Sequence, residues 1–187
     1  MADDRFARLV ELACHDLRTP LATVSGFAKT LTRTGGLADR DARFVAMIDE
    51  AAGQIGALVD LLGQAARIES GRYDPLLAEA DTFALASGSA DGQVAVEGAG
   101  ATIETSADAL ARALGLLASA ALRFGDVPAV TWRVDGRELV LSPLEPAAEP
   151  VVTGESPRDL GALVARLTIE ALGGKLSVES GGLHVLL

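Results

Sequence analysis

The sequence predicts an α+β protein, in which an N-terminal helical hairpin is followed by a small α/β sandwich. Apolar residues recur every three or four positions through residues 1–73, as they do on one face of a long helix. From Pro75 onward, short β-branched runs bounded by Gly and Asp alternate with helical segments. The 187 residues, of which 49% are hydrophobic, can build a core in each part. We therefore expect two domains, residues 1–73 and 74–187.

The first expected helix runs from about Asp4 to Arg33 and ends at the Gly35-Gly36 pair. Its apolar stripe contains Phe6, Val10, Ala13, Leu17, Leu21, Val24, Ala28 and Leu31. A second helix is expected to begin near Asp39 or Asp41, either of which can cap it. Its stripe contains Phe44, Ile48, Ala51, Ile55, Leu58, Leu62 and Ala65.

Two long helices joined by a short turn form an antiparallel hairpin, which leaves much of each apolar stripe facing water. Dimerisation into a four-helix bundle would bury these stripes, so we expect a homodimer. The alternative is that the hairpin packs against the rest of its own chain.

The C-terminal part combines short strands with two longer helices. The expected strands are Gln93–Val96, Val130–Val134, Glu138–Leu141, Lys175–Glu179 and Leu183–Leu187. The expected helices are Ala107–Phe124 and Asp159–Leu172, which end at glycines. This order of elements predicts an α/β sandwich of about 110 residues.

Charge and cysteine content narrow the choice of partner and compartment. A net charge of -10 argues against nucleic acid or an anionic membrane as the main partner, because both prefer a basic surface. The single Cys14 cannot form an internal disulfide, no signal peptide is recognised, and no apolar run reaches a membrane span of about 18 residues. We therefore expect a cytoplasmic protein.

His15 lies on the polar side of the first helix. Successive residues turn by about 100°, so Ala13 and Leu17 lie about 160° from His15 and the imidazole faces water. Asp16 is its neighbour, and Thr19 follows one turn later. A neutral imidazole can act as a nucleophile, and an adjacent carboxylate can fix its tautomer or accept its proton. The alternative is an ordinary surface histidine.

The segment from His15 to Leu21, His-Asp-Leu-Arg-Thr-Pro-Leu, resembles the phosphoacceptor motif of HisKA-type sensor histidine kinases. Ala66–Gly71 resembles the end of the dimerisation domain in the same family. The resemblance implies a homodimeric four-helix bundle with His15 as phosphoacceptor. It also implies that Asp16 is the general base and that Thr19 orients water in a phosphatase reaction.

The C-terminal half resembles, more weakly, the ATP-binding domain of these kinases, but it lacks the groups that bind nucleotide. Leu116 and Ala120 stand where the family has asparagines that ligate Mg²⁺. Ser142–Pro146 replaces the box whose carboxylate binds adenine, and Pro157–Gly161 retains one glycine of the last glycine box. The resemblance therefore implies a degenerate ATP-binding domain with no cofactor of its own.

These features resemble the ChpT-type histidine phosphotransferases of bacterial two-component phosphorelays. The resemblance implies that His15 carries a phosphoryl group between receiver-domain aspartates of response regulators and hybrid kinases. Mg²⁺ is then expected in the partner receiver domain. An ATP-dependent histidine kinase, a non-catalytic dimeric adaptor and a specific phosphatase remain as alternatives.

Overall fold

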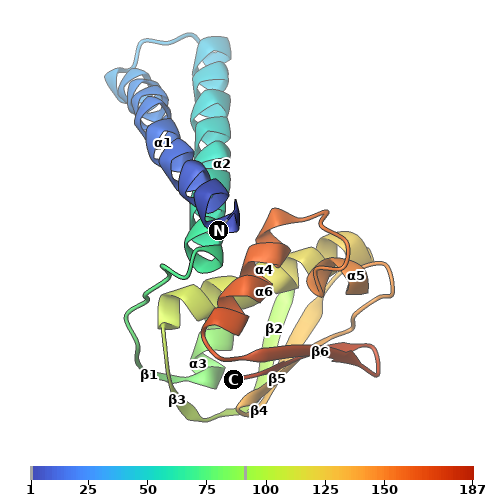
Figure 1. Cartoon of the computed structure of the whole chain (residues 1–187). Coiled ribbons are helices and arrows are strands. Elements are labelled where there is room, and N and C mark those ends of the chain that lie inside the picture. The colour runs from blue at the N-terminus through green and yellow to red at the C-terminus, as the bar shows by residue number, and fades with distance from the viewer. Residues whose placement is uncertain (1, 91) are drawn as a thin grey trace. The chain divides into compact units, whose positions relative to one another are not determined.

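The computed structural model describes residues 2–90 and 92–187, with the backbone alone for residues 2–5. The chain divides into two compact units, Met1–Arg72 and Tyr73–Leu187. The first is a helical hairpin and the second is an α/β domain, which confirms the predicted α+β class (Figure 1). Among the described residues, no helix has the length and apolar character needed to cross a membrane.

The hairpin consists of α1 (Ala2–Thr34) and α2 (Asp39–Glu69), joined by a short connection. Both helices have nearly the predicted extent. The predicted cap of α2 is wrong, because Ala38 is the N-cap and makes no side-chain capping bond. Asp39 and Asp41 lie instead in the first turn, where their charges interact favourably with the helix dipole.

Each hairpin helix has two distinct faces. The inner face, turned toward the other helix, is made of small and medium-sized buried residues: Ala7, Cys14, Ala28, Val45, Ala52, Val59, Gly63 and Ala66. The outward stripe contains large apolar residues that are 40% to 68% exposed: Phe6, Leu9, Leu17, Val24, Phe27, Leu31, Phe44, Met47, Ile48, Ile55, Leu58 and Leu62.

The division into two faces corrects the predicted stripe of the first helix. Ala28 is buried and Leu21 is half-buried, whereas Phe27 is exposed. Spacings of three and four residues fit two neighbouring stripes on one helix, so periodicity alone could not assign these residues to one of them.

The second unit contains a five-stranded mixed sheet in the order β2-β4-β5-β7-β6. Its strands are β2 (Val94–Gly100), β4 (Val130–Gly136), β5 (Glu138–Ser142), β6 (Lys175–Glu179) and β7 (Gly182–Leu186). β2 and β4 are parallel, and the remaining pairs are antiparallel. A separate two-stranded sheet pairs β1 (Ala78–Asp81) with β3 (Thr102–Thr105).

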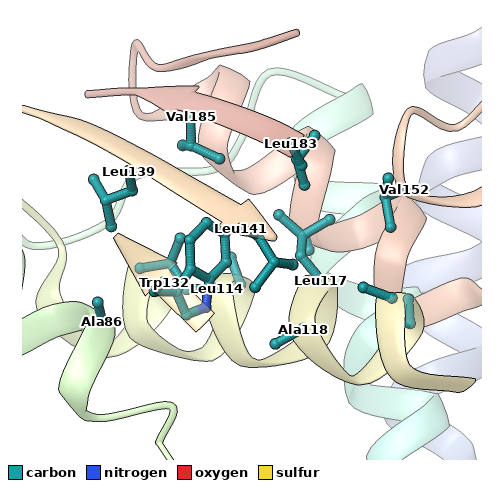
Figure 2. Close-up of a cluster of buried hydrophobic side chains, with 14 of the residues drawn as sticks. Ala86, Leu114, Leu117, Ala118, Trp132, Leu139, Leu141, Val152, Leu183 and Val185 are labelled. Carbon is teal, nitrogen blue, oxygen red and sulfur yellow. The ribbon is translucent and has the colours of Figure 1, made fainter. Parts of the chain in front are cut away.

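The helices of this unit are α3 (Thr82–Ser87), α4 (Ala107–Gly125), α5 (Glu149–Val152) and α6 (Leu160–Ala171). α4 and α6 lie over one face of the five-stranded sheet (Figure 1). Alternate strand residues point into the core between the layers, where Trp132 packs among Leu114, Leu139 and Leu141 (Figure 2). The opposite sheet face is more polar and carries Arg133 and His184.

The sequence analysis missed four short elements, β1, α3, β3 and α5. The sequence of β1, Ala-Glu-Ala-Asp, has low strand propensity, so only pairing with β3 makes it a strand. α3 has six residues and α5 has four, which is too short for a helical apolar period to be recognised.

We predict that Trp132→Ala lowers the stability of the second unit by about 3–5 kcal/mol, because it leaves a large cavity in the core. Trp132 is fully buried, and its indole N–H has no hydrogen-bond partner among the described residues. Urea unfolding followed by far-UV circular dichroism measures the loss. Arg133→Ala is the control, since this neighbour lies on the opposite sheet face and its exposed ion pair is worth less than about 1 kcal/mol. Equal losses in the two variants would contradict the packing described.

Candidate functional site

His15 lies about two-fifths of the way along α1, with 78% of its side chain exposed. Its Nδ1 lies 3.2 Å from Oδ1 of Asp16, whose side chain is 69% exposed. The other ring nitrogen, Nε2, makes no polar contact with any residue that the structure describes. The imidazole is therefore accessible to another molecule and has a carboxylate beside one of its nitrogens.

This pairing gives the two ring nitrogens different chemical roles. A proton on Nδ1 can be donated to the Asp16 carboxylate, and Nε2 then keeps an unshared electron pair. An exposed lone pair on imidazole can attack an electrophile, while the carboxylate stabilises positive charge that develops on the ring. The arrangement can thus support nucleophilic chemistry at Nε2.

Thr19 is exposed on α1, one turn beyond His15. Its backbone carbonyl accepts a hydrogen bond from the hydroxyl of Thr23 at 3.0 Å. Within the described part of the chain, no side-chain hydrogen bond links Thr19 to His15 or Asp16. The structure therefore brings His15 and Asp16 into contact and leaves Thr19 as a separate polar group on the same helix.

Arg18, which the sequence analysis did not single out, links the two helices close to His15. Its Nε and Nη2 donate to Oδ1 of Asp60 on α2 at 3.0 and 2.9 Å. Gly63 of α2 lies beside this crossing, and a Cβ there would be in ordinary contact with Nη2 of Arg18 at 3.4 Å. Because Arg18 and Asp60 are 42 residues apart, no local sequence pattern identifies them as a pair. An arginine on the inner face of a helix could, however, have suggested an acidic partner on the other helix.

Polar contacts also cross the hairpin at two further places. Near its open end, Glu11 lies 2.9 Å from Nη2 of Arg72, and the Ser70 hydroxyl donates to Glu11 at 3.3 Å. Toward the connection, the Ser25 hydroxyl donates to Asp49 at 2.6 Å. The inner face of the hairpin is therefore polar at intervals, in contrast to the apolar outward stripe.

Two of the segments expected to bind nucleotide, around Leu116 and around Gly161, contact each other. Leu116 of α4 packs against the start of α6, where a Cβ on Gly161 would lie 2.9 Å from Leu116 Cδ2. Nη1 of Arg123 is 3.0 Å from Oδ2 of Asp159, and the other oxygen of this carboxylate accepts the Ala162 N–H at 2.8 Å. An apolar contact and an ion pair thus join α4 directly to the N-terminus of α6.

The segment that follows β5 packs into the core. Leu144, Ala148, Val151 and Val152 are buried there with side chains of α4. Among the described residues, no group of three or more His, Cys, Asp and Glu side chains could hold a metal ion.

Residues 7–71 match the model of the His Kinase A (phospho-acceptor) domain family. The hairpin is therefore a HisKA phospho-acceptor domain, a type of domain that acts in two-component phosphotransfer signalling. His15, Asp16 and Thr19 all lie within the matched residues. A search of curated proteins found no match.

The similarity to solved structures covers both the hairpin and the α/β domain. Full-length ShkA in complex with AMPPNP matches with a TM-score of 0.71 and 22% identity, over 95% of this chain and 44% of ShkA. The Acinetobacter baumannii histidine kinase AdeS matches with a TM-score of 0.55 and 14% identity, over 92% of this chain and 96% of AdeS. These identities show a shared fold alone, and the chain spans less than half the length of ShkA.

A bacterial phosphotransferase also matches, with 17% identity over 96% of this chain and 94% of that protein. Its TM-score of 0.34 is too low to support an argument.

Proposed function

We propose that this chain is a histidine phosphotransferase that relays a phosphoryl group between receiver-domain aspartates through His15. One observation carries the proposal: a HisKA domain presents an exposed histidine whose Nε2 makes no polar contact with the described residues, while Leu116 and Asp159, at positions expected to bind ATP, contact Gly161 and Arg123 of their own chain. A histidine that is available for phosphorylation but lacks its own donor must receive the phosphoryl group from another protein.

The phosphoryl transfer needs no cofactor bound to this chain, because every bond formed is matched by a bond broken in the receiver or in phosphohistidine. The lone pair of His15 Nε2 attacks the phosphorus of an aspartyl phosphate, the bond between phosphorus and the aspartyl oxygen breaks, and the carboxylate leaves with the electron pair. The Nδ1–H proton stays between the ring and Asp16, whose negative charge favours the imidazolium product. A second receiver carboxylate then attacks phosphorus, and the nitrogen–phosphorus pair returns to Nε2.

In this mechanism Asp16 acts on the ring and Thr19 acts on water. Asp16 holds the tautomer that leaves Nε2 nucleophilic, and it can accept the Nδ1 proton when neutral phosphohistidine forms. Thr19 orients water in a competing hydrolysis of the phosphoryl group. The partners are receiver domains of response regulators and hybrid kinases, and each receiver supplies the Mg²⁺ that binds its own phosphoryl group.

The electrostatics of the second unit also disfavour a nucleotide. Residues 73–187 contain 16 acidic and 7 basic residues, so this unit carries a net charge of -9 out of the total -10. A triphosphate would approach an acidic domain and would have to displace the Arg123–Asp159 ion pair. Both effects support a phosphorelay role over that of an ATP-dependent kinase.

The outward stripe of the hairpin supports a homodimer. Large apolar side chains that are about half exposed line both helices, and a pocket lined by Phe6, Val10 and Leu62 lies among them. A second hairpin packed against this stripe would complete a four-helix bundle and bury these side chains.

We predict that His15→Ala abolishes phosphoryl transfer from a phosphorylated receiver, because the nucleophile is lost. The protein is mixed with a radiolabelled phosphoreceiver, and the label that it acquires is measured. The mass of the dimer is measured separately, to check that the variant still assembles. His184→Ala is the matched control, since His184 is the other histidine of the chain and bonds Glu138 in the sheet. Transfer that survives in His15→Ala would refute the proposal, and receiver binding without any transfer by the parent protein would favour an adaptor.

We predict that the double variant Leu31→Glu, Ile48→Glu dissociates the dimer. Burying each side chain contributes about 1.5–3 kcal/mol, so replacing both with charges weakens association at least about 100-fold. Analytical ultracentrifugation over a concentration series measures the change. Lys29→Glu, an exposed change on α1 outside the stripe, is expected to leave the dimer intact. Unchanged association of the double variant would show that this stripe is not the dimer interface.

We predict that Thr19→Ala slows release of inorganic phosphate from the phosphorylated receiver but spares transfer to His15, because the hydroxyl acts on water and not on the ring. Phosphate release and the label on His15 are measured in the same reaction. Thr30→Ala, at another exposed threonine of α1, serves as the control. Equal losses of both activities in Thr19→Ala would argue against this division of roles.

A further inference from the structure

The inner face of α1 carries a polar residue at every seventh position. Glu11, Arg18 and Ser25 follow this interval. Arg18 and Ser25 each contact a carboxylate of α2, and Glu11 contacts residues that directly follow α2. Between them the inner face contains Cys14, Leu21 and other small or medium-sized apolar residues. Three polar crosslinks at a heptad interval therefore join α1 to the other side of the hairpin.

The first two crosslinks lie on either side of His15. Glu11 precedes His15 by four residues and Arg18 follows it by three, so each lies about one helical turn away. The Arg18–Asp60 pair has the more demanding geometry, because Nε and Nη2 of one guanidinium both donate to a single carboxylate oxygen. This pair constrains the rotation of α1 about its own axis at the turn next to His15.

The energetics indicate a role in orientation more than in stability. Arg18 and Asp60 are 44% and 51% exposed, and an exposed ion pair contributes no more than about 1 kcal/mol. Apart from these polar pairs, the inner seam consists of small and medium-sized residues, which permit more than one rotational setting of two packed helices. Polar pairs in such a seam can select one register at little gain in stability.

A small rotation of α1 has a large effect at His15. Side-chain atoms lie about 6 Å from a helix axis, so a rotation of about 20° moves them by about 2 Å. A misplacement of about 1 Å can slow a reaction that depends on alignment by roughly 100-fold. In-line phosphoryl transfer is a reaction of this kind.

We propose that Arg18 and Asp60 are positioning residues that fix the rotational setting of α1 and thereby the direction in which His15 Nε2 meets the incoming phosphorus. The inference rests on the proposed relay function. Gly63 lies next to this pair on α2, where an added Cβ would be within van der Waals distance of the Arg18 guanidinium.

The experiment compares single-turnover transfer from a radiolabelled phosphoreceiver to the parent protein and to the variants Arg18→Ala, Asp60→Ala and Arg18→Lys. Measuring the rate at saturating concentrations of the phosphoreceiver separates the transfer rate within the bound complex from the apparent affinity of the protein for the receiver. We expect the rate of the bound complex to fall at least about tenfold in both alanine variants, with a smaller fall for Arg18→Lys, which keeps the charge. Dimer mass and helix content are expected to stay at the parent values.

The charge-exchanged double variant Arg18→Asp, Asp60→Arg separates positioning from direct contact with the receiver. An internal pair is restored by the exchange, so we expect its rate to recover to within about threefold of the parent. Arg133→Ala is the matched control, because Arg133 forms an exposed ion pair with Glu97 in the sheet and is expected to have no effect.

Several outcomes would overturn the inference while the parent protein transfers normally. These are an unchanged rate in Arg18→Ala, a loss in Arg18→Ala without a loss in Asp60→Ala, and a double variant that stays dimeric but slow. Loss of the dimer in the single variants would assign the pair to assembly and would also overturn the inference. Failure of the parent protein to accept phosphoryl would refute the relay function itself.

Discussion

The packing of α1 against α2 is the contact on which the position of His15 depends. The inner faces of both helices are small and interrupted by polar crosslinks, whereas their outward stripes are large and apolar. This asymmetry fits two proposed tasks, in which the crosslinks fix how the two helices face each other and the stripes bury apolar area in a dimer. His15 lies outside the inner seam and remains open to a partner.

The second unit has the same layered fold as part of the histidine kinase structures that it matches. Within it, side chains of α4 contact the start of α6 directly. The contact of Leu116 with α6, the ion pair of Arg123 with Asp159 and the burial of Val151 and Val152 all bind the helical layer together. Each of these residues engages its own chain, which supports the proposal that the second unit is kept for its core and binds no nucleotide.

Much of this architecture could be predicted because it follows from strong local periodicity. The long hairpin helices, the five strands of the main sheet, α4 and α6 all carry apolar patterns that the sequence displays. The exposure of His15 followed from helix geometry, and Asp16 could be named because it is the next residue in the sequence. The Arg18–Asp60 pair, the cap at Ala38 and strand β1 could not be predicted, because each depends on a partner distant in sequence or on the exact end of a helix.

In the proposed relay, phosphoryl reaches His15 from another protein and not from ATP. The most direct test supplies the full chain with each donor in turn, radiolabelled ATP with Mg²⁺ in one reaction and a radiolabelled phosphoreceiver with Mg²⁺ in the other. We expect acid-labile label on His15 from the phosphoreceiver and none from ATP. Labelling of His15 by ATP alone would contradict the proposed relay.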